Sequence, residues 1–404
     1  MNKQVFIVAD IGLGANSAYH VGDEAMFLCN LQQYRKMDWR IVASSRSLSH
    51  ASEDFIEVRD LYIKNIPAFL FRLGQCFLIK WVKINSFPQY FKATVQEVIS
   101  SDLVHISGGG NLTSFWPGHI YYRCFIIVLA SLYSIPIVMT GQTIGPFTKR
   151  LHSIVLGFFL NYVLFIGVRD NEYSSNQLKA LGVHKPRVVV MPDDATLLEV
   201  LNNQELIVHS GINVGLSLHE GAENFDALRE AITALSEMNP QIHFYLIPHY
   251  FDEKNSFDIL SMQEVVASID SERVHLIDFL TLFDKESINT IPQRVKAMTS
   301  QMDILIATRY HGIIFALSSG VPVVAVNYDE YYAAKNNGAL GQYFGSHEAY
   351  SIEYKHIDSR VFLNAVNYVL SHQNELNLHL QHKSMAMRAS TSKWYADIIH
   401  PYVQ

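Results

Sequence analysis

Short apolar runs alternate with longer amphipathic stretches along the first half of the chain. Runs rich in Val and Ile predict β-strands, and they occur at residues 4–10, 39–45, 102–108, 135–141, 164–170 and 187–193. Stretches long enough for helices separate these runs, at residues 22–37, 88–100, 118–133, 149–162 and 171–181. This alternation indicates a parallel sheet with helices on both of its faces.

The same pattern begins again after a polar stretch at residues 199–211. A second set of strands is predicted at 212–218, 241–248, 273–278, 303–309 and 322–328, with helices at 224–238, 253–268, 292–300 and 312–319. We therefore expect an α/β protein with two doubly wound Rossmann-like domains facing a cleft, over residues 1–200 and 201–370. A last helical stretch, 371–404, is expected to pack back on the first domain.

Composition and charge narrow the class of protein. The chain has 404 residues, of which 49% are hydrophobic and 17% charged, and this excludes a disordered chain. Its net charge of −7 argues against non-specific nucleic-acid binding, which needs clustered positive charge. The three cysteines, Cys29, Cys76 and Cys124, match neither a disulfide framework nor a zinc pattern and are interpreted as buried thiols.

Three segments of the sequence bear on the cellular compartment of the protein and on contact with a membrane. The start of the chain does not look like a signal peptide, so we expect a cytoplasmic protein. Residues 151–168 carry no formal charge, but we interpret them as a buried helix followed by a strand rather than a membrane span. Residues 66–84 form an apolar run with Arg72, Lys80 and Lys83. We favour a core helix for that run; the alternative is a helix lying on a membrane, which would place the protein peripherally at the inner face.

The unusual residues cluster after the predicted strands, where ligands bind in open parallel sheets. Gly12, Gly14 and Asn16 follow the first strand, and a helix then begins at GDEA (22–25). Free N–H groups at a helix start favour anions, and Asp23 is a candidate for binding substrate there. Acidic residues such as Asp23 and Glu24 are also ordinary first-turn chemistry.

Two glycine-rich segments follow later strands. Consecutive glycines at 108–110 allow a tight turn or close approach of a ligand, so Gly109, Gly110 and Asn111 are candidates for binding substrate. The segment GQTIGP (141–146) follows the next predicted strand and offers Gln142.

Charged residues follow two further strands of the first domain. Arg169 leaves an apolar strand and predicts a carboxylate or phosphate partner. Its partner is either an anionic ligand or a neighbouring carboxylate, Asp170 or Glu172. In PDDA (192–195), Asp193 or Asp194 acts as a base, holds a substrate hydroxyl or caps a turn.

The second domain offers the clearest pair. In an extended segment Arg309 and His311 share one face, close to a predicted helix start. Arg binds anions bidentately, and His transfers protons near neutral pH. We take both as functional. Tyr328 and Lys335 follow the next strand, and Lys335 either meets a phosphate or faces solvent.

The ordered set of motifs resembles the polysaccharide pyruvyl transferase family. It comprises GDEA (22–25), GGGN (108–111), GQTIGP (141–146), Arg169 to Ser174, PDDA (192–195), TRYHGIIFALSSGVP (308–322) and Tyr328 to Lys335. The resemblance implies a fold similar to GT-B glycosyltransferases and transfer of pyruvate from phosphoenolpyruvate to a sugar as a ketal. Arg309 and His311 match the family's Arg-x-His element, and Arg169 matches its strand-exit arginine.

This resemblance gives the site residues roles. Arg169 and Arg309 would hold phosphoenolpyruvate, the donor substrate, and His311 would be the general acid, with no cofactor or metal. The acceptor would be a glycan, lipid-linked or nucleotide-linked. Two alternatives stay open: a GT-B-type glycosyltransferase that uses a nucleotide sugar, and a binding protein without catalytic activity.

Overall fold

A computed structural model gives the structure of the protein for residues 3–12, 19–46, 54–82, 88–170, 172–200, 209–219, 226–251, 257–277, 290–399 and 401. The chain divides into two compact units. Unit 1 comprises Met1–Ser17, Met26–Asp194 and Ser390–Gln404, and unit 2 comprises Ala18–Ala25 and Ala195–Ala389. Gly14, Asn16 and Lys83, which the sequence analysis singled out, lie outside the described residues.

Unit 1 is built on a parallel sheet with strand order β4-β3-β1-β5-β7-β8-β9, and β6 also pairs with β7. The strands are β1 (Gln4–Ile11), β3 (Arg40–Ser45), β4 (Ile56–Arg59), β5 (Leu103–Ile106), β6 (Gly109–Leu112), β7 (Ile137–Ile144), β8 (Phe165–Val168) and β9 (Arg187–Val190). The helices are α1 (Val21–Arg35), which continues into this unit from unit 2, α2 (Ile66–Val82), α3 (Gln89–Ile99), α4 (Pro117–Leu132), α5 (Arg150–Leu160) and α6 (Tyr173–Ala180), followed by the 3₁₀ turn Asp194–Leu197. The doubly wound order predicted from the alternation is confirmed.

Two glycine-rich segments of unit 1 differ from the sequence prediction. The glycine segment at 108–110 was interpreted as a tight turn or a place of close ligand approach; it is not a turn, because Gly109 begins β6, which lies parallel to the end of β7. The segment GQTIGP was expected to follow its strand, but β7 continues through it to Ile144. Each segment satisfies the backbone groups of the other, and the sequence pattern cannot show this because their residues are far apart.

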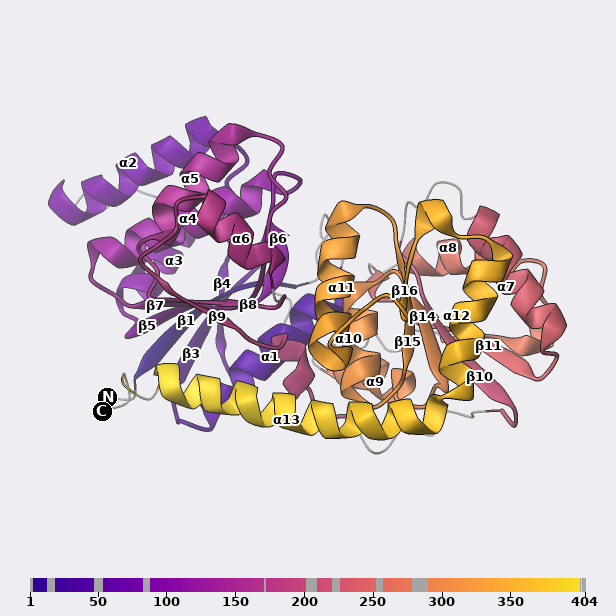
Figure 1. Cartoon of the computed structure of the whole chain (residues 1–404). Helices are drawn as coiled ribbons and strands as arrows, with labels where there is room; N and C mark the ends of the chain where they lie inside the picture. Colours follow the sequence, from indigo (N-terminus) through magenta and orange to yellow (C-terminus); the bar gives the residue numbers. More distant parts are fainter. Residues whose placement is uncertain are drawn as a thin grey trace. The chain divides into compact units, whose positions relative to one another are not determined.

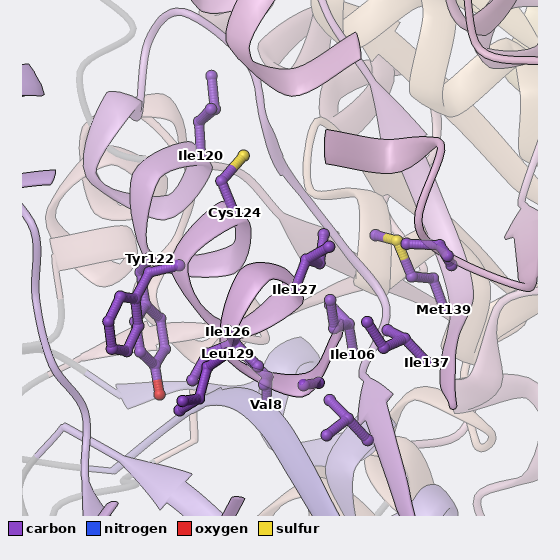
Figure 2. Packing of buried hydrophobic residues seen from close by; sticks show 14 of the residues in the cluster. Val8, Ile106, Ile120, Tyr122, Cys124, Ile126, Ile127, Leu129, Ile137 and Met139 are labelled. Atoms are coloured by element: carbon purple, nitrogen blue, oxygen red, sulfur yellow. The ribbon is translucent and has the colours of Figure 1, made fainter. Parts of the chain in front are cut away.

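The core of unit 1 lies between the sheet and the helices α2 to α6 (Figure 1). Apolar side chains along α4 belong to this core, and Ile127 among them points toward Ile106 on β5 and Met139 on β7 (Figure 2). Side chains on all sides of α4 are buried, because the helices α2, α3 and α5 pack against α4 in addition to the sheet. The cysteines Cys29, Cys76 and Cys124 are buried thiols, as expected.

Helix α2 is a core helix on one face only, so our preference for a core helix at residues 66–84 is confirmed in part. Phe69 and Cys76 are buried, but Phe71 is 64% exposed and Trp81 74% exposed. The cations do not snorkel into solvent, because Lys80 contacts the carbonyl of Leu132 and the Tyr133 ring. The sequence of this apolar run does not show which of its side chains the rest of the fold covers.

Unit 2 is built on a second parallel sheet with the order β13-β11-β10-β14-β15-β16, and the pair β12-β2 is antiparallel. The strands are β2 (Tyr19–His20), β10 (Ile212–Ser217), β11 (Ile242–Leu246), β12 (Tyr250–Phe251), β13 (Val274–Leu276), β14 (Ile304–Ala307), β15 (Val323–Asn327) and β16 (Ser351–Glu353). The helices are α7 (Asp226–Met238), α8 (Phe257–Val265), α9 (Ile291–Thr299), α10 (Tyr310–Ser318), α11 (Glu330–Phe344), α12 (Ser359–Ser371) and α13 (Gln373–Ile399), with 3₁₀ turns at Ser271–Arg273 and Tyr354–His356.

Residues 151–168 form a helix and then a strand, α5 and β8, as predicted. No helix in the described part of the chain has the length and apolar content that a membrane span requires. The C-terminal helical stretch is α13, whose residues up to Ala389 belong to unit 2 and whose later residues belong to unit 1.

Candidate functional site

The site in unit 2 forms where β10 and β14 lie side by side at the centre of its sheet. Strand order reverses at this point, which is where doubly wound sheets bind ligands. The backbone N–H groups of Thr308 and Arg309 both donate to the carbonyl of Ser217, at 3.0 and 3.2 Å. The chain leaving β14 is therefore held against the end of β10 just before α10 begins.

Arg309 is fixed by a carboxylate that the sequence analysis missed. Its Nε donates to Asp258 at 3.1 Å, and its Nη2 pairs with the other carboxylate oxygen. Asp258 is fully buried on α8 and also accepts from the backbone N–H of His249 at 2.9 Å. The Arg309 side chain stays 19% exposed. No local pattern identifies Asp258, because only the fold brings α8 to this strand end.

His311 lies in the first turn of α10, immediately after Arg309. Arg309 is the extended residue before the helix, and Tyr310 begins it. The sequence argument that residues two apart share a face was therefore wrong here, because His311 is already helical. The expected helix start is confirmed, and it places the imidazole where free N–H groups gather.

Gly22 packs against the His311 ring. A Cβ at position 22 would lie 1.7 Å from Nδ1 of His311, so only glycine fits beside the ring. The start of α1 belongs to unit 2, where the N–H of Val21 donates to the carbonyl of His249 at 3.0 Å. Asp23 is half-buried in the same turn. Gly22 of the GDEA motif thus lies directly against the His311 ring.

Two further histidines, His219 and His249, line this strand end. The Ser217 hydroxyl lies 2.9 Å from Nδ1 of His249, and the Thr308 hydroxyl lies 3.0 Å from Nδ1 of His219. Burial, reinforced by the charge of Arg309, lowers the pKa of each to about 3. Both are therefore neutral hydrogen-bonding groups. Their position just after predicted strands was the signal that sequence reasoning overlooked.

Lys335 and Tyr328 lie among aromatic rings. The Nζ atom of Lys335 is 4.4 Å from the ring centroid of Tyr331 and 5.6 Å from that of Tyr310. The Tyr328 ring stacks on Tyr354 with centroids 5.0 Å apart, and burial raises the pKa of its hydroxyl. Lys335 is therefore partly buried, with tyrosine rings around its ammonium group, and not an ordinary solvent-facing lysine.

Arg169 in unit 1 has a buried ion-pair partner, Asp193. Its Nη1 lies 2.6 Å from the Asp193 carboxylate, and its Nε donates to Thr143 at 2.8 Å. Asp170, one of the partners considered from the sequence, accepts from the backbone N–H and the hydroxyl of Ser174 in the first turn of α6. The Arg169 side chain is 2% exposed.

Asp194 and Gln142 belong to a buried hydrogen-bond network in unit 1. Asp194 accepts from the hydroxyls of Thr140 and Tyr395, the latter at 2.8 Å. Burial raises the pKa of Asp194 to about 6. The Gln142 amide donates to the carbonyl of Ser107 at 2.7 Å. Both side chains thus make their hydrogen bonds to buried groups of the protein itself.

Asn111 on β6 leads to a charged cluster that sequence reasoning missed. Its amide donates to Asp10, which also pairs with Arg123 at 2.6 Å and with His119 at 3.1 Å. Burial alone would raise the pKa of Asp10, but Arg123 and His119 hold it well below its usual range. Burial and the charge of Asp10 raise the pKa of nearby Asp60 to about 7. Gly109 and Gly110 are buried on the same strand.

The predicted site residues thus fall into two groups. Unit 2 holds Asp23, Arg309, His311, Tyr328 and Lys335, and unit 1 holds Gly109, Gly110, Asn111, Gln142, Arg169 and Asp194. Asp23 comes early in the sequence, among residues of unit 1, but belongs to unit 2 because the first turn of α1 folds with that unit.

The fold is similar to those of solved sugar-nucleotide enzymes and glycosyltransferases. Anabaena HepE, solved with UDP-glucose, has a TM-score of 0.60 at 13% identity, covering 98% of this chain and 99% of that one. A putative UDP-N-acetylglucosamine 2-epimerase from Listeria monocytogenes has 0.61 at 11%, covering 99% and 98%. Sucrose-phosphate synthase from Thermosynechococcus elongatus has 0.60 at 12%, covering 99% and 100%. These likenesses show a GT-B-like fold with two Rossmann-like domains.

Comparison with curated protein sequences finds no match. The family profile of polysaccharide pyruvyl transferase, in contrast, matches residues 20–330. That range begins just before Gly22 and includes Arg169, Arg309 and His311. Because the match covers most of the chain, and the motifs lie at the strand ends where this fold binds ligands, the protein belongs to the polysaccharide pyruvyl transferase family.

Proposed function

We propose that this protein transfers pyruvate from phosphoenolpyruvate to a sugar of a cell-surface polysaccharide or its precursor, as a ketal. The observation that carries the proposal is the arrangement at the start of α10. A partly exposed guanidinium, Arg309, and a seated imidazole, His311, lie together at a helix start. This combination suits a small anion that must be bound and then protonated.

Phosphoenolpyruvate carries its charge on a phosphate and a carboxylate, so its site needs cations and N–H donors. Arg309 is oriented by Asp258, which leaves the remaining guanidinium N–H groups for an anion. Lys335 is a second cation near Tyr310 in the first turn of α10. We assign the donor to these groups, and the proposal uses no metal or cofactor.

His311 is proposed to deliver a proton to the methylene carbon of phosphoenolpyruvate, which becomes a methyl group. The electron-poor C2 then accepts one sugar hydroxyl, and a second hydroxyl forms the ketal as the C2–O bond to phosphate breaks. Of the two hydroxyl protons, one replaces the proton that His311 gave and the other leaves with phosphate. A helix start disfavours a charged imidazole, but a bound trianion beside it favours one.

Neutral His249 and Gly22 are proposed as positioning residues for His311. Gly22 fixes the ring from one side. His249 is held by Ser217 and lies near Arg309 and His311. Tyr328 and Asp23 are proposed to contact substrate at the edge of this group.

The proposed roles of the unit 1 residues differ according to the hydrogen bonds and ion pairs that each side chain already makes within the protein. Arg169 is proposed to bind an anionic group of the substrate, although Asp193 and Thr143 already hold part of its guanidinium. Gly109, Gly110 and Asn111 are proposed to contact substrate through β6. Gln142 and Asp194 are proposed to position this region, because their side chains already bond buried groups.

The test uses phosphoenolpyruvate, acceptor glycans and mass spectrometry of the product. We expect addition of pyruvate with release of inorganic phosphate. His311→Ala should abolish transfer and leave phosphoenolpyruvate binding within a few-fold, whereas Arg309→Lys should weaken that binding. His356→Ala, in an exposed turn, is the matched control. Pyruvyl transfer that survives in His311→Ala would show that another group supplies the proton.

A glycosyltransferase with a nucleotide-sugar donor is the second candidate. HepE, which has a similar fold at 13% identity, was solved with UDP-glucose. The same mass-spectrometric screen with nucleotide sugars separates the two, since a hexose would be added instead of pyruvate. A rise in melting temperature with phosphoenolpyruvate but not with nucleotides would favour the first proposal, and the reverse would favour the second. Binding without transfer of either group would indicate a non-catalytic member.

We also propose that the protein acts at the inner face of a membrane, which it contacts through the exposed side of α2. α2 and α5 are neighbours, with the rings of Phe69 and Phe159 5.7 Å apart. Their outer faces carry apolar residues, Leu70, Phe71, Phe77, Leu78, Trp81, Leu151, Ile154 and Phe158, that are 41–74% exposed. Neither helix nor the adjacent α4 contains Asp or Glu, and Lys149 and Arg150 are exposed at the start of α5. An apolar face without negative charge suits an anionic bilayer.

Vesicle binding tests this contact. We expect sedimentation with vesicles that contain anionic phospholipid and a blue shift of Trp81 fluorescence on binding. Phe71→Ser with Trp81→Ser should abolish sedimentation, while Leu260→Ser, at an exposed apolar residue of α8, should not. Equal sedimentation of both variants would exclude this face, and self-association lost in the first variant would indicate a protein interface instead.

A further inference from the structure

Three histidines from separate segments meet at one end of the unit 2 sheet. His209 lies just before β10, His243 is the second residue of β11, and His275 is the middle residue of β13. Nδ1 of His243 lies 3.0 Å from Nε2 of His275. One ring nitrogen from each residue lies within 4.8 Å of the others. In the described ranges this is the only such group of three metal-ligating side chains.

Strand register and one hydrogen-bonded tyrosine bring these side chains together. His275 lies opposite Tyr245 in the parallel pair of β11 and β13, and His243 is two residues before Tyr245. The side chains of His243, Tyr245 and His275 therefore project from the same face of the sheet. The Tyr245 hydroxyl lies 2.9 Å from Nδ1 of His209 and accepts its backbone N–H at 3.1 Å. The Tyr245 hydroxyl thus holds both the backbone and the ring of His209 next to His243 and His275.

This cluster is not explained by core packing. His209 is exposed, and the other two are partly buried. The ring of His209 stacks on those of His275 and His243, with centroids 4.1 and 4.6 Å apart. Imidazoles placed this close repel one another when they are charged, so the arrangement suits neutral rings, the form that binds metals.

We propose that His209, His243 and His275 form a binding site for a divalent transition-metal ion, with Zn²⁺ as the best fit. Imidazole is a preferred ligand of Zn²⁺, with Zn–N distances of about 2.0–2.1 Å, which place tetrahedral ligand nitrogens about 3.3 Å apart. The 3.0 Å separation of the His243 and His275 nitrogens is close to that spacing. Parallel stacked rings cannot aim their in-plane lone pairs at one ion, so the exposed His209 ring has to turn toward it. A water molecule would complete the tetrahedron.

The position of the site indicates a structural or regulatory ion rather than a catalytic one. His243 lies near the start of β11 and His209 precedes β10, whereas Ser217 is the last residue of β10 and Thr308 and Arg309 follow the end of β14. An ion here would tie the edge strand β13 and the segment before β10 to β11. The inference is independent of the proposed transferase reaction, and its failure would leave that proposal untouched.

The test is titration of the full-length chain, without an affinity tag of histidines and stripped with EDTA, with Zn²⁺ alone in a calorimeter. We expect one ion per chain and a rise in melting temperature on binding. The variants are His209→Gln, at an exposed ligand whose replacement threatens folding least, and the pair His243→Gln with His275→Gln. Each should weaken binding by at least about tenfold. His356→Gln with His382→Gln, both exposed elsewhere, is the control and should bind as the parent does.

The outcomes are decisive in either direction. Circular dichroism without metal establishes that each variant folds, and the His209 variant carries the test if the double variant does not. Loss of the bound ion and of the rise in melting temperature in the variants, but not in the control, supports the site. Absence of one-to-one binding in the parent, or equal affinity in the His209 variant and the control, overturns it.

Discussion

Replacing Gly22 with Ala puts a methyl group into the space that the His311 ring occupies. The added Cβ would lie 1.7 Å from Nδ1 and 2.1 Å from Cγ of that ring. Non-bonded carbon atoms prefer separations of about 3.5–4.0 Å, so the ring or the helix start must move by roughly 2 Å. Overpacking of this kind costs about 1–3 kcal/mol.

The same substitution is favourable where space allows. Alanine replaces glycine in a helix with a gain of up to about 1 kcal/mol, and Gly22 lies in the first turn of α1. We therefore expect Gly22→Ala to lower the free energy of unfolding by about 1–3 kcal/mol. In a His311→Ala background it should be neutral or stabilising. Urea unfolding of the parent, both single variants and the double variant measures this coupling.

Gly74→Ala is the matched control, because a Cβ at Gly74 of α2 has no neighbour within 4 Å. It should stabilise the protein or leave it unchanged. An equal loss of stability from Gly22→Ala with and without the His311 ring would refute the seating of His311 by Gly22. In the transferase assay, a ring displaced by more than about 1 Å should reduce turnover by about 100-fold.

Three further substitutions probe unit 1. Asp193→Ala leaves the guanidinium of Arg169 buried without its carboxylate and should lower the free energy of unfolding in urea by about 3–5 kcal/mol. Asp226→Ala, at an exposed ion pair, is the control and should lower it by less than about 1 kcal/mol. Equal losses in the two variants would contradict the buried pairing. Asp60 has a folded-state pKa of about 7 against an ordinary value of 3.8, so the native state binds more protons between those values and stability should fall as pH rises from about 4 to about 7. Asp60→Asn should flatten that part of the stability profile, and an unchanged slope would show that the carboxyl titrates normally. Tyr395→Phe removes a hydroxyl that bonds two buried groups and should cost about 1–3 kcal/mol; a loss below the error of the measurement would show that water replaces it.

The alternation of apolar runs predicted both sheets and most of their strands, but not β4, β6 or β16. Strands such as β1 and β10 are buried at nearly every position, so apolar residues recur along them and the signal is strong. The pattern failed where local preference and tertiary pairing disagree. The glycines at 108–110 favour a turn by themselves, yet β6 forms because the end of β7 supplies its partners.

The candidate site residues that could be identified from the sequence are those that directly follow predicted strands. Arg309 and His311 could be recognised because a polar pair after an apolar strand is unusual in any fold. Their supports could not, since Asp258 and Gly22 reach the same place from distant segments. The same holds for Asp193 as the partner of Arg169.

The sequence by itself determined the class of fold, the family and the residues that carry the proposed reaction, because hydrophobic periodicity and strand-end motifs are local properties. Only the tertiary structure decided which side of α2 stays exposed, which carboxylates hold the arginines, and that three histidines far apart in the chain meet on one face of a sheet. Burial and ion pairing depend on what the rest of the chain places nearby, and strand register sets those neighbours.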